Sequence, residues 1–281
     1  AALAFAADLL TQGSPTRKIR DLSDKAIADR NQPDLFTKAA ANLDKTHRGQ
    51  FAPAQILKCI EAAVTLDDFE AGMAVERTCF AACLGDPQRE ALIHIFFAER
   101  AANKIPGLSK EMPLIDVQKA AVIGSVTMGG GIAMCCANAG IAVQLHDNDP
   151  EGLKRGLKVI EGNYARTVAK GRLSQAAMDQ RMALIEPADS LEAFDQADVV
   201  VEAVYENLDL KKEIFAKLDG IMKPGTLLAS NTSGLDIDAI AASTSRPEFV
   251  CGMHFFSPAN VIRLLGVVRG AKSSPEALGT A

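Results

Sequence analysis

The spacing of apolar residues along the chain changes near residue 118. Up to about residue 104 they recur at helical spacing, as Leu92 and Phe96 do, so this part is predicted to be entirely helical. From residue 118 short apolar runs alternate with helical segments, which predicts an α/β fold with a doubly wound, mostly parallel sheet. Two prolines and a glycine within residues 105–116 predict a linker. The predicted division is residues 1–110, a linker at 111–117, and residues 118–281.

Five apolar runs in the second part are predicted to be buried strands. They cover residues 120–123, 141–145, 198–203, 226–230 and 249–253. The run that ends at residue 253 is taken as the last strand. In open α/β sheets, ligands bind at the carboxyl ends of the strands, so polar residues just after these runs are the candidates for chemistry.

The connection after the first strand has the pattern of a dinucleotide-binding turn, with one exception. Gly124 and Gly129 frame the turn and a helix follows it. Asp147 follows the next strand near the ~20-residue spacing of a carboxylate that receives the adenosine ribose. A solvated loop acid is the alternative for Asp147. Val126 is the exception, because a Rossmann-type turn uses glycine there to let the backbone approach the pyrophosphate.

Composition limits the function classes. The hydrophobic content of 48% and the charged content of 23% are ordinary for a globular protein. A net charge of −5 argues against a nucleic-acid surface. No apolar stretch approaches the ~18 residues of a membrane span. The six cysteines include no CxxC pair, which favours buried free thiols over a metal site.

Polar side chains gather at the predicted strand ends. Glu206 and Lys211 follow one strand, Asn231 and Ser233 follow the next, and His254 ends the last. A plain surface charge pair is the alternative for Glu206 and Lys211. A single histidine is more often structural, but its place at a strand end beside serines and a carboxylate favours a catalytic role.

Three segments together resemble the L-3-hydroxyacyl-CoA dehydrogenase family. They are residues 124–133, 230–233 and 254–261, and the His-Phe-Phe-Ser-Pro sequence at His254 is the most specific. Residues 91–108 resemble the linker helix that joins a hydratase/isomerase half to the dehydrogenase half in multifunctional β-oxidation enzymes. The resemblance implies that residues 1–110 are the helical tail of that first half with the linker helix. Residues 118–281 would then be the NAD-binding Rossmann domain.

The resemblance also implies an activity, the oxidation of L-3-hydroxyacyl-CoA to 3-ketoacyl-CoA with NAD. His254 would take the hydroxyl proton, and Ser233 would hydrogen-bond the substrate hydroxyl and the nicotinamide region. Further cofactor contacts are implied at Gly124, Val126, Thr127, Met128, Gly129, Asp147, Val204, Tyr205, Glu206, Lys211, Asn231 and Ser257. The implied partners are an acyl-CoA substrate and, in the full-length protein, a second copy or a thiolase subunit. The implied location is the cytoplasm in bacteria, or mitochondria or peroxisomes in eukaryotes.

The chain departs from the family pattern in three ways. Val126 replaces a turn glycine, and Gly266 stands where the family has the glutamate that holds the histidine. The chain ends at Ala281, before the helical C-terminal domain of the family, and the hydratase elements would lie before Ala1. We therefore expect this chain alone to be inactive in oxidation and in hydration. Two alternatives stay open: a non-catalytic assembly or acyl-CoA-binding module, and another Rossmann dehydrogenase of the 6-phosphogluconate type.

Overall fold

The computed structural model describes residues 2–13, 18, 20, 24–32, 34–102, 104–109 and 111–281. The chain forms two compact units, Ala1–Lys104 and Ile105–Ala281. In the segment before β1 (Lys119–Ile123), the Ile115 amide donates to Thr280 Oγ1 at 3.0 Å, and Leu108 and Val117 contact the core of the second unit. The roles predicted above for residues 1–110 and for the linker stay predictions.

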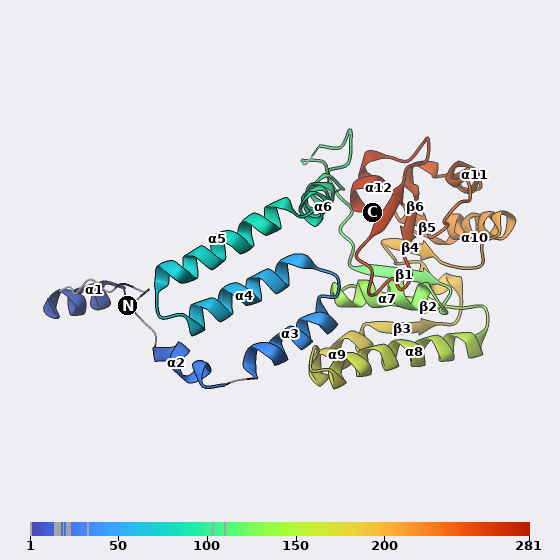
Figure 1. The fold of residues 1–281 in the computed structure, drawn as a ribbon. Coiled ribbons are helices and arrows are strands. Elements are labelled where there is room, and N and C mark those ends of the chain that lie inside the picture. The colour runs from blue at the N-terminus through green and yellow to red at the C-terminus, as the bar shows by residue number, and fades with distance from the viewer. Residues whose placement is uncertain are drawn as a thin grey trace. The chain divides into compact units, whose positions relative to one another are not determined.

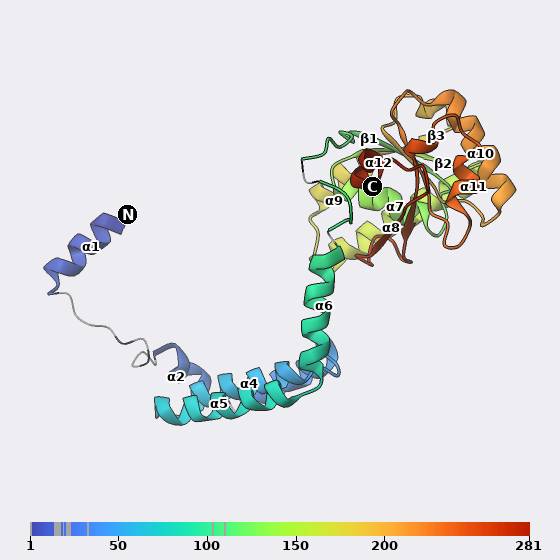
Figure 2. The same cartoon turned by 90° about the horizontal axis from the view of Figure 1, so that it is seen from above.

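Every regular element described in the first unit is a helix, which confirms the helical prediction for these residues. α4 and α5 pack along each other in both views (Figures 1 and 2). The apolar residues of α6 line a groove together with Phe51 and Ala52 of α4. The six helices described are α1 (Ala2–Thr11), α2 (Asp24–Arg30), α3 (Leu35–Thr46), α4 (Phe51–Thr65), α5 (Phe69–Gly85) and α6 (Gln88–Ala102).

A seven-stranded sheet forms the centre of the second unit as described. The strand order is β3-β2-β1-β4-β5-β6-β7, and all neighbouring strands are parallel except β6 and β7. This order confirms the doubly wound, mostly parallel prediction. The strands are β1 (Lys119–Ile123), β2 (Ala142–His146), β3 (Ile185–Ala188), β4 (Val199–Glu202), β5 (Leu227–Ser230), β6 (Val250–Phe255) and β7 (Leu265–Val268).

The prediction that the run ending at residue 253 is the last strand was wrong. β7 follows β6 and pairs with it antiparallel, with Gly266 opposite His254. β3 was also missed. Both strands are short, β3 contains Pro187 and the middle of β7 is a glycine, so neither has an uninterrupted apolar pattern.

Helices cover both faces of the sheet because successive strand residues point to opposite sides. Ala120 and Val122 pack against α7 (Gly129–Asn138), α8 (Pro150–Ala169), α9 (Gln175–Ala183) and α12 (Pro275–Thr280). Ala121 and Ile123 face the other layer, formed by α10 (Leu208–Ile221) and α11 (Ile237–Ala241) (Figure 1). Short 3₁₀ turns at Leu191–Phe194 and Pro247–Phe249 precede β4 and β6.

The structure also bears on the expectations drawn from composition. All six cysteines are free, but only Cys79 and Cys251 are buried, and the other four are half-buried. Across the described ranges, no group of three or more His, Cys, Asp or Glu side chains is placed to hold a metal ion. No described helix combines the length and hydropathy needed to cross a membrane.

Candidate functional site

The turn between β1 and α7 closes against the end of β4. Gly124 has a φ of +94°, and its amide donates to the His146 carbonyl at 2.8 Å. A Cβ at Gly124 would lie 2.7 Å from the Ala203 carbonyl oxygen, and a Cβ at Gly129 would lie 1.6 Å from the Gly124 oxygen. Only glycine fits these two positions, which is the geometry of a turn that holds a strand, a helix and a ligand close together.

Val126 lies on the exposed side of this turn. Its side chain is 67% exposed, and Thr127 beside it is exposed as well. Met128, the N-cap of α7, makes no side-chain capping hydrogen bond. The first turn of a helix leaves backbone N–H groups without intrahelical partners, and such groups attract phosphate. The turn therefore offers an anion site, with the Val126 side chain next to it.

Asp147 binds the turn as well as facing the site. Its Oδ2 accepts from the amide and the hydroxyl of Ser125 at 2.9 and 2.7 Å, and its Oδ1 accepts from the Asp149 amide at 3.1 Å. Burial opposes ionisation, but these hydrogen bonds outweigh it and lower the pKa of Asp147. A carboxylate has about four acceptor positions, so one remains on Oδ1 for a further hydrogen-bond donor.

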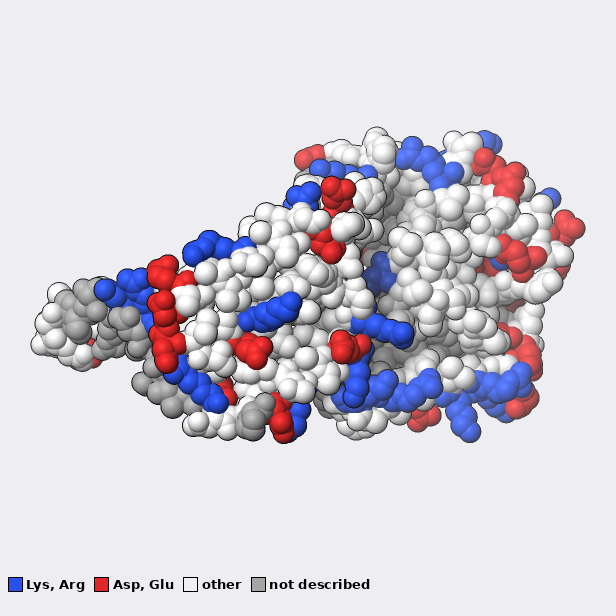
Figure 3. Space-filling view, in the orientation of Figure 1, with Lys and Arg blue, Asp and Glu red and all other residues white. Residues whose placement is uncertain are grey.

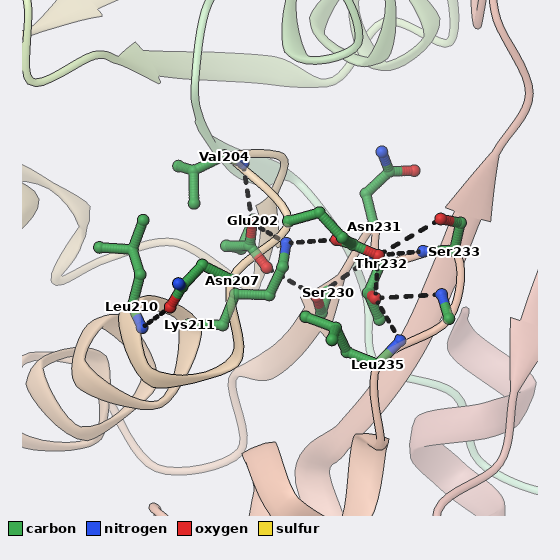
Figure 4. Close-up of polar contacts among 12 residues, drawn as sticks. Glu202, Val204, Asn207, Leu210, Lys211, Ser230, Asn231, Thr232, Ser233 and Leu235 are labelled. Carbon is green, nitrogen blue, oxygen red and sulfur yellow. Dashed lines mark hydrogen bonds and ion pairs between the residues drawn. The ribbon is translucent and has the colours of Figure 1, made fainter.

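Lys211 is the centre of a polar group at the end of β4 (Figure 4). Its Nζ lies 2.7 Å from Glu202 Oε1 and 3.3 Å from Glu206 Oε2. The Lys211 and Glu202 side chains are 1% and 0% exposed. The alternative of a plain surface charge pair for Glu206 and Lys211 is therefore wrong. We call Glu202, Glu206 and Lys211, with Ser230, Thr232 and Ser233, the Lys211 cluster.

Glu206 connects this cluster to the segment after β5. Its Oε1 accepts from Thr232 Oγ1 at 2.6 Å and from the Ser233 amide at 2.9 Å, with Ser233 Oγ at 3.3 Å. Partial burial would raise its pKa, but the hydrogen bonds from Thr232 and Ser233 and the charge of Lys211 lower the pKa of Glu206 to about 2. Glu206 is thus a carboxylate with fixed orientation at neutral pH.

Asn231 holds β5 to β6. The side-chain oxygen Oδ1 of Asn231 accepts from the backbone amide of Phe255 at 2.8 Å, and the backbone amide of Asn231 donates to the Glu202 carbonyl at 2.7 Å. In Figure 4 its side chain points away from Lys211. This tie fixes the strand segment that carries His254.

His254 lies near the end of β6, one strand away from Ser233 in the sheet order. Its ring centroid is 4.7 Å from that of Phe256. Gly266 is its partner across the β6–β7 pair, and a Cβ built there would lie 3.6 Å from His254 Cβ and 4.0 Å from Nδ1. The position has room for a side chain that reaches the imidazole, but Gly266 supplies none.

The structure places the predicted residues in three groups along one edge of the sheet. The turn residues and Asp147 follow β1 and β2, the Lys211 cluster follows β4 and β5, and His254 with Ser257 follows β6. Val204 donates its amide to Glu202, while Tyr205 and Ser257 are exposed. Direct contacts join Glu206, Lys211 and Ser233.

Sequence reasoning missed Glu202 and Ser125 as members of the site. Glu202 had a signal, because a charge inside the apolar run 199–203 must be paired if the strand is buried. No sequence pattern pointed to Ser125, since its hydrogen bonds to Asp147 depend on the fold of the turn.

Comparisons with known proteins agree with this arrangement. Residues 119–281 match the family model described as 3-hydroxyacyl-CoA dehydrogenase, NAD binding domain. The peroxisomal bifunctional enzyme of Danio rerio is 39% identical over 252 residues, which is 88% of this chain and 34% of that protein. The fatty acid oxidation complex subunit alpha of Psychrobacter cryohalolentis is 35% identical over 82% of this chain and 32% of its own. The chain thus spans about a third of the length of these curated relatives.

Solved structures show the same likeness. The 3-hydroxybutyryl-CoA dehydrogenase of Escherichia coli has a TM-score of 0.57 and 40% identity, over 58% of this chain and 34% of its own. The dehydrogenase part of multifunctional enzyme 1 of Caenorhabditis elegans has a TM-score of 0.57 and 33% identity, over 63% and 41%.

Proposed function

The chain belongs to the 3-hydroxyacyl-CoA dehydrogenase family, and we propose that it takes part in the NAD-dependent oxidation of L-3-hydroxyacyl-CoA to 3-ketoacyl-CoA in a multifunctional β-oxidation enzyme. The His-Phe-Phe-Ser-Pro sequence at His254, after Ser-Asn-Thr-Ser at residues 230–233, argues against the alternative of a 6-phosphogluconate-type dehydrogenase. The observation that carries the proposal is the Lys211 cluster, which holds Glu206 and Ser233 at the carboxyl edge of the sheet next to the glycine turn.

The residues present fit a dinucleotide at all but one position. Gly124 lies so close to Ala203 that a Cβ has no space, and the N-terminus of α7 offers amides to a pyrophosphate. Asp147 is ionised and keeps an acceptor position, so it would hold the adenosine ribose. Val126 is the misfit, because a Rossmann-type turn has glycine at this position to let the backbone approach the pyrophosphate, and Val126 is exposed there.

When bound, NAD supplies the hydride acceptor. His254 takes the proton of the 3-hydroxyl at an imidazole nitrogen, the general-base role that histidine most often has. Ser233 hydrogen-bonds the substrate hydroxyl and the nicotinamide region. The Ser233 backbone amide donates to Glu206 Oε1 at 2.9 Å, so Glu206 orients the serine before substrate binds.

The surface charge supports an anionic substrate such as an acyl-CoA. The chain has a net charge of −5, yet in the second unit Lys and Arg side chains gather along the edge formed by α8 (Figure 3). The α8 sequence contains Lys154, Arg155, Lys158 and Arg166, of which Lys154 pairs with Glu151 and Arg155 with Asp149. A local positive stripe on an acidic protein attracts phosphate-bearing ligands.

A second candidate function is a non-catalytic acyl-CoA-binding or assembly module. Gly266 favours it, because His254 has no carboxylate there to fix its tautomer. Val126 favours it too, because a valine stands where a Rossmann-type turn has glycine. The proposed partners, a second copy or a thiolase subunit, apply to either function, as does a peroxisomal, mitochondrial or bacterial cytoplasmic location.

The two candidate functions can be distinguished by changing Val126 and Gly266 to the residues that the family has at these positions. In a full-length multifunctional protein that contains this chain, Val126→Gly with Gly266→Glu should give reduction of acetoacetyl-CoA with NADH, and His254→Gln in the same background should abolish this reaction. NADH binding without any turnover in that protein would reject the dehydrogenase function in favour of the binding module. Failure to bind NADH would also reject the dehydrogenase function and would leave the acyl-CoA-binding or assembly module.

A further inference from the structure

Glu202 and Lys211 form an ion pair that is enclosed in the second unit. The two side chains are 0% and 1% exposed, and Lys211 Nζ lies 2.7 Å from Glu202 Oε1. Removing two charges from water has a large desolvation cost, and an apolar pair of similar volume is often at least as stable. The pair is therefore weak evidence for a purely stabilising role, and its place beside the cofactor candidates points to another one.

Glu202 connects three segments of the site. Its Oε1 accepts from the Val204 amide at 2.8 Å as well as from Lys211, and its Oε2 accepts from Ser230 Oγ at 2.6 Å. These donors come from the loop after β4, from α10 and from the end of β5. Figure 4 shows the three converging on the carboxylate. A single side chain thus sets the spacing of every segment in the Lys211 cluster.

Lys211 transmits this constraint to Glu206. The Lys211 side chain is nearly inaccessible, so its ammonium acts on the site through its 3.3 Å contact with Glu206 Oε2. The other oxygen of Glu206 binds Thr232 and Ser233. Without the Glu202 carboxylate, the buried ammonium would have Glu206 as its remaining anion and would draw it away from Thr232 and Ser233.

We propose that Glu202 is a positioning residue for the cofactor site: it fixes Lys211 between two carboxylates and so keeps Glu206 bound to Thr232 and Ser233. This inference rests on the proposed function for its consequence, NAD binding. Glu202 itself does not reach the site surface, because it is fully buried.

The first test measures NADH affinity by fluorescence titration of the whole chain in the Val126→Gly background. Glu202→Gln keeps the size of the side chain and removes its charge, and we expect about tenfold weaker binding, the equivalent of one lost charged hydrogen bond. The matched control is Glu213→Gln, which breaks the exposed Glu213–Lys217 pair on α10, the helix that carries Lys211. Its NADH affinity should stay within about twofold of the parent. Unchanged affinity in Glu202→Gln would overturn the proposal.

The second test needs no cofactor, so it separates this inference from the proposed function. The amide resonance of Ser233 is followed by NMR, together with its hydrogen exchange. Glu202→Gln should shift the resonance and speed the exchange, although the two residues are not in contact, and Glu213→Gln should leave both unchanged. A Ser233 amide that matches the parent in folded Glu202→Gln contradicts the proposal, even if NADH binds no variant. Should Glu202→Gln not fold, Glu202→Asp shortens the side chain and withdraws the carboxylate from Lys211, and it should move the Ser233 amide in the same direction; no movement there rejects the proposal.

Discussion

The carboxyl ends of β4 and β6 lie along one edge of the sheet but differ in how their polar groups are paired. At the end of β4, Glu202 accepts bonds on both oxygens and Lys211 lies between two carboxylates. Near the end of β6, His254 lies opposite Gly266, which has no side chain to offer. Under the proposed function the two strand ends serve different steps, because the Lys211 cluster holds Glu206 and Ser233 for the cofactor and His254 takes the proton. Changes at Glu202 and at Gly266 are therefore expected to act on different measurements, NADH affinity and turnover.

The largest expected effect comes from supplying the carboxylate at the β6 end. In a full-length multifunctional protein that contains this chain, Gly266→Glu in the Val126→Gly background should raise the turnover of acetoacetyl-CoA by about 10²–10⁴, by analogy with the loss seen when the carboxylate beside a catalytic histidine is removed. The β7 backbone has space for the side chain. Gly266→Gln is the matched control, and an equal gain from glutamine would show that side-chain volume rather than charge is responsible.

The next effect concerns stability at the β4 end. Lys211→Met leaves the Glu202 carboxylate buried without its cation, and we expect a loss of about 3–5 kcal/mol in the free energy of unfolding. Both tyrosines, Tyr164 and Tyr205, lie in the second unit and the chain has no tryptophan, so tyrosine fluorescence in urea reports that unit alone.

Two further variants test the cause of that loss. Adding Glu202→Gln to Lys211→Met should recover part of the stability, because the uncompensated charge is gone. Lys217→Met, on the exposed face of α10, should change the free energy by less than about 0.5 kcal/mol. A loss as large at Lys217 as at Lys211 would contradict the account.

Val126, in the turn between β1 and α7, should have a smaller effect, on NADH affinity. Val126→Gly should tighten NADH binding by about tenfold or more, equivalent to ~1.4 kcal/mol or more, because the phosphates can then approach the backbone. Val126→Ala keeps the Cβ and should give an intermediate affinity in calorimetry. If the parent and the glycine variant bind NADH equally, the steric argument is wrong.

Asp147 should set the choice between cofactors. In the Val126→Gly background the chain should bind NADH several-fold more tightly than NADPH, because a 2′-phosphate would face the Asp147 carboxylate. Asp147→Asn should narrow that preference. Calorimetry with both cofactors checks this, and equal affinity in the presence of Asp147 would reject its assigned role.

The smallest effect is on acid stability. The pKa of Glu206 in the folded chain is about 2, below the ordinary value of 4.5, so its stabilising contribution is present above pH 4.5 and is lost as the pH falls toward 2. Glu206→Gln should therefore lose less stability than the parent across that interval in urea titrations. Its side chain is 40% exposed, so solvent screening keeps the difference small. A parallel loss in both proteins would mean that the hydrogen bonds and the Lys211 charge do not lower the pKa of Glu206 in solution.

Much of the fold could be predicted from the sequence, because β1, β2, β4, β5 and β6 are apolar runs between turn residues. β7 could not, since Gly266 interrupts its short pattern and its pairing with β6 depends on distant contacts. The position of His254 at a strand end was accessible from the pattern, but its pairing opposite Gly266 was not.

Most residues of the candidate site could be predicted from the sequence, but the contacts that join them could not. The sequence places Glu206, Lys211 and Ser233 after neighbouring strands, and the structure joins them by direct contacts. Periodicity cannot show that Glu202 is the main partner of Lys211, because the pair depends on how β4 and α10 pack. Likewise, the bonds from Ser125 to Asp147 depend on the path of the turn.

The central claim is that the Lys211 cluster organises an NAD site through Glu206. The most direct test is an NADH titration of the Val126→Gly chain, with and without Glu206→Gln, using Glu213→Gln as the control on α10. The account predicts saturable binding that weakens by about tenfold or more in Glu206→Gln and stays unchanged in Glu213→Gln. Equal NADH affinity with and without the Glu206 carboxylate, or no saturable binding at all, would contradict it.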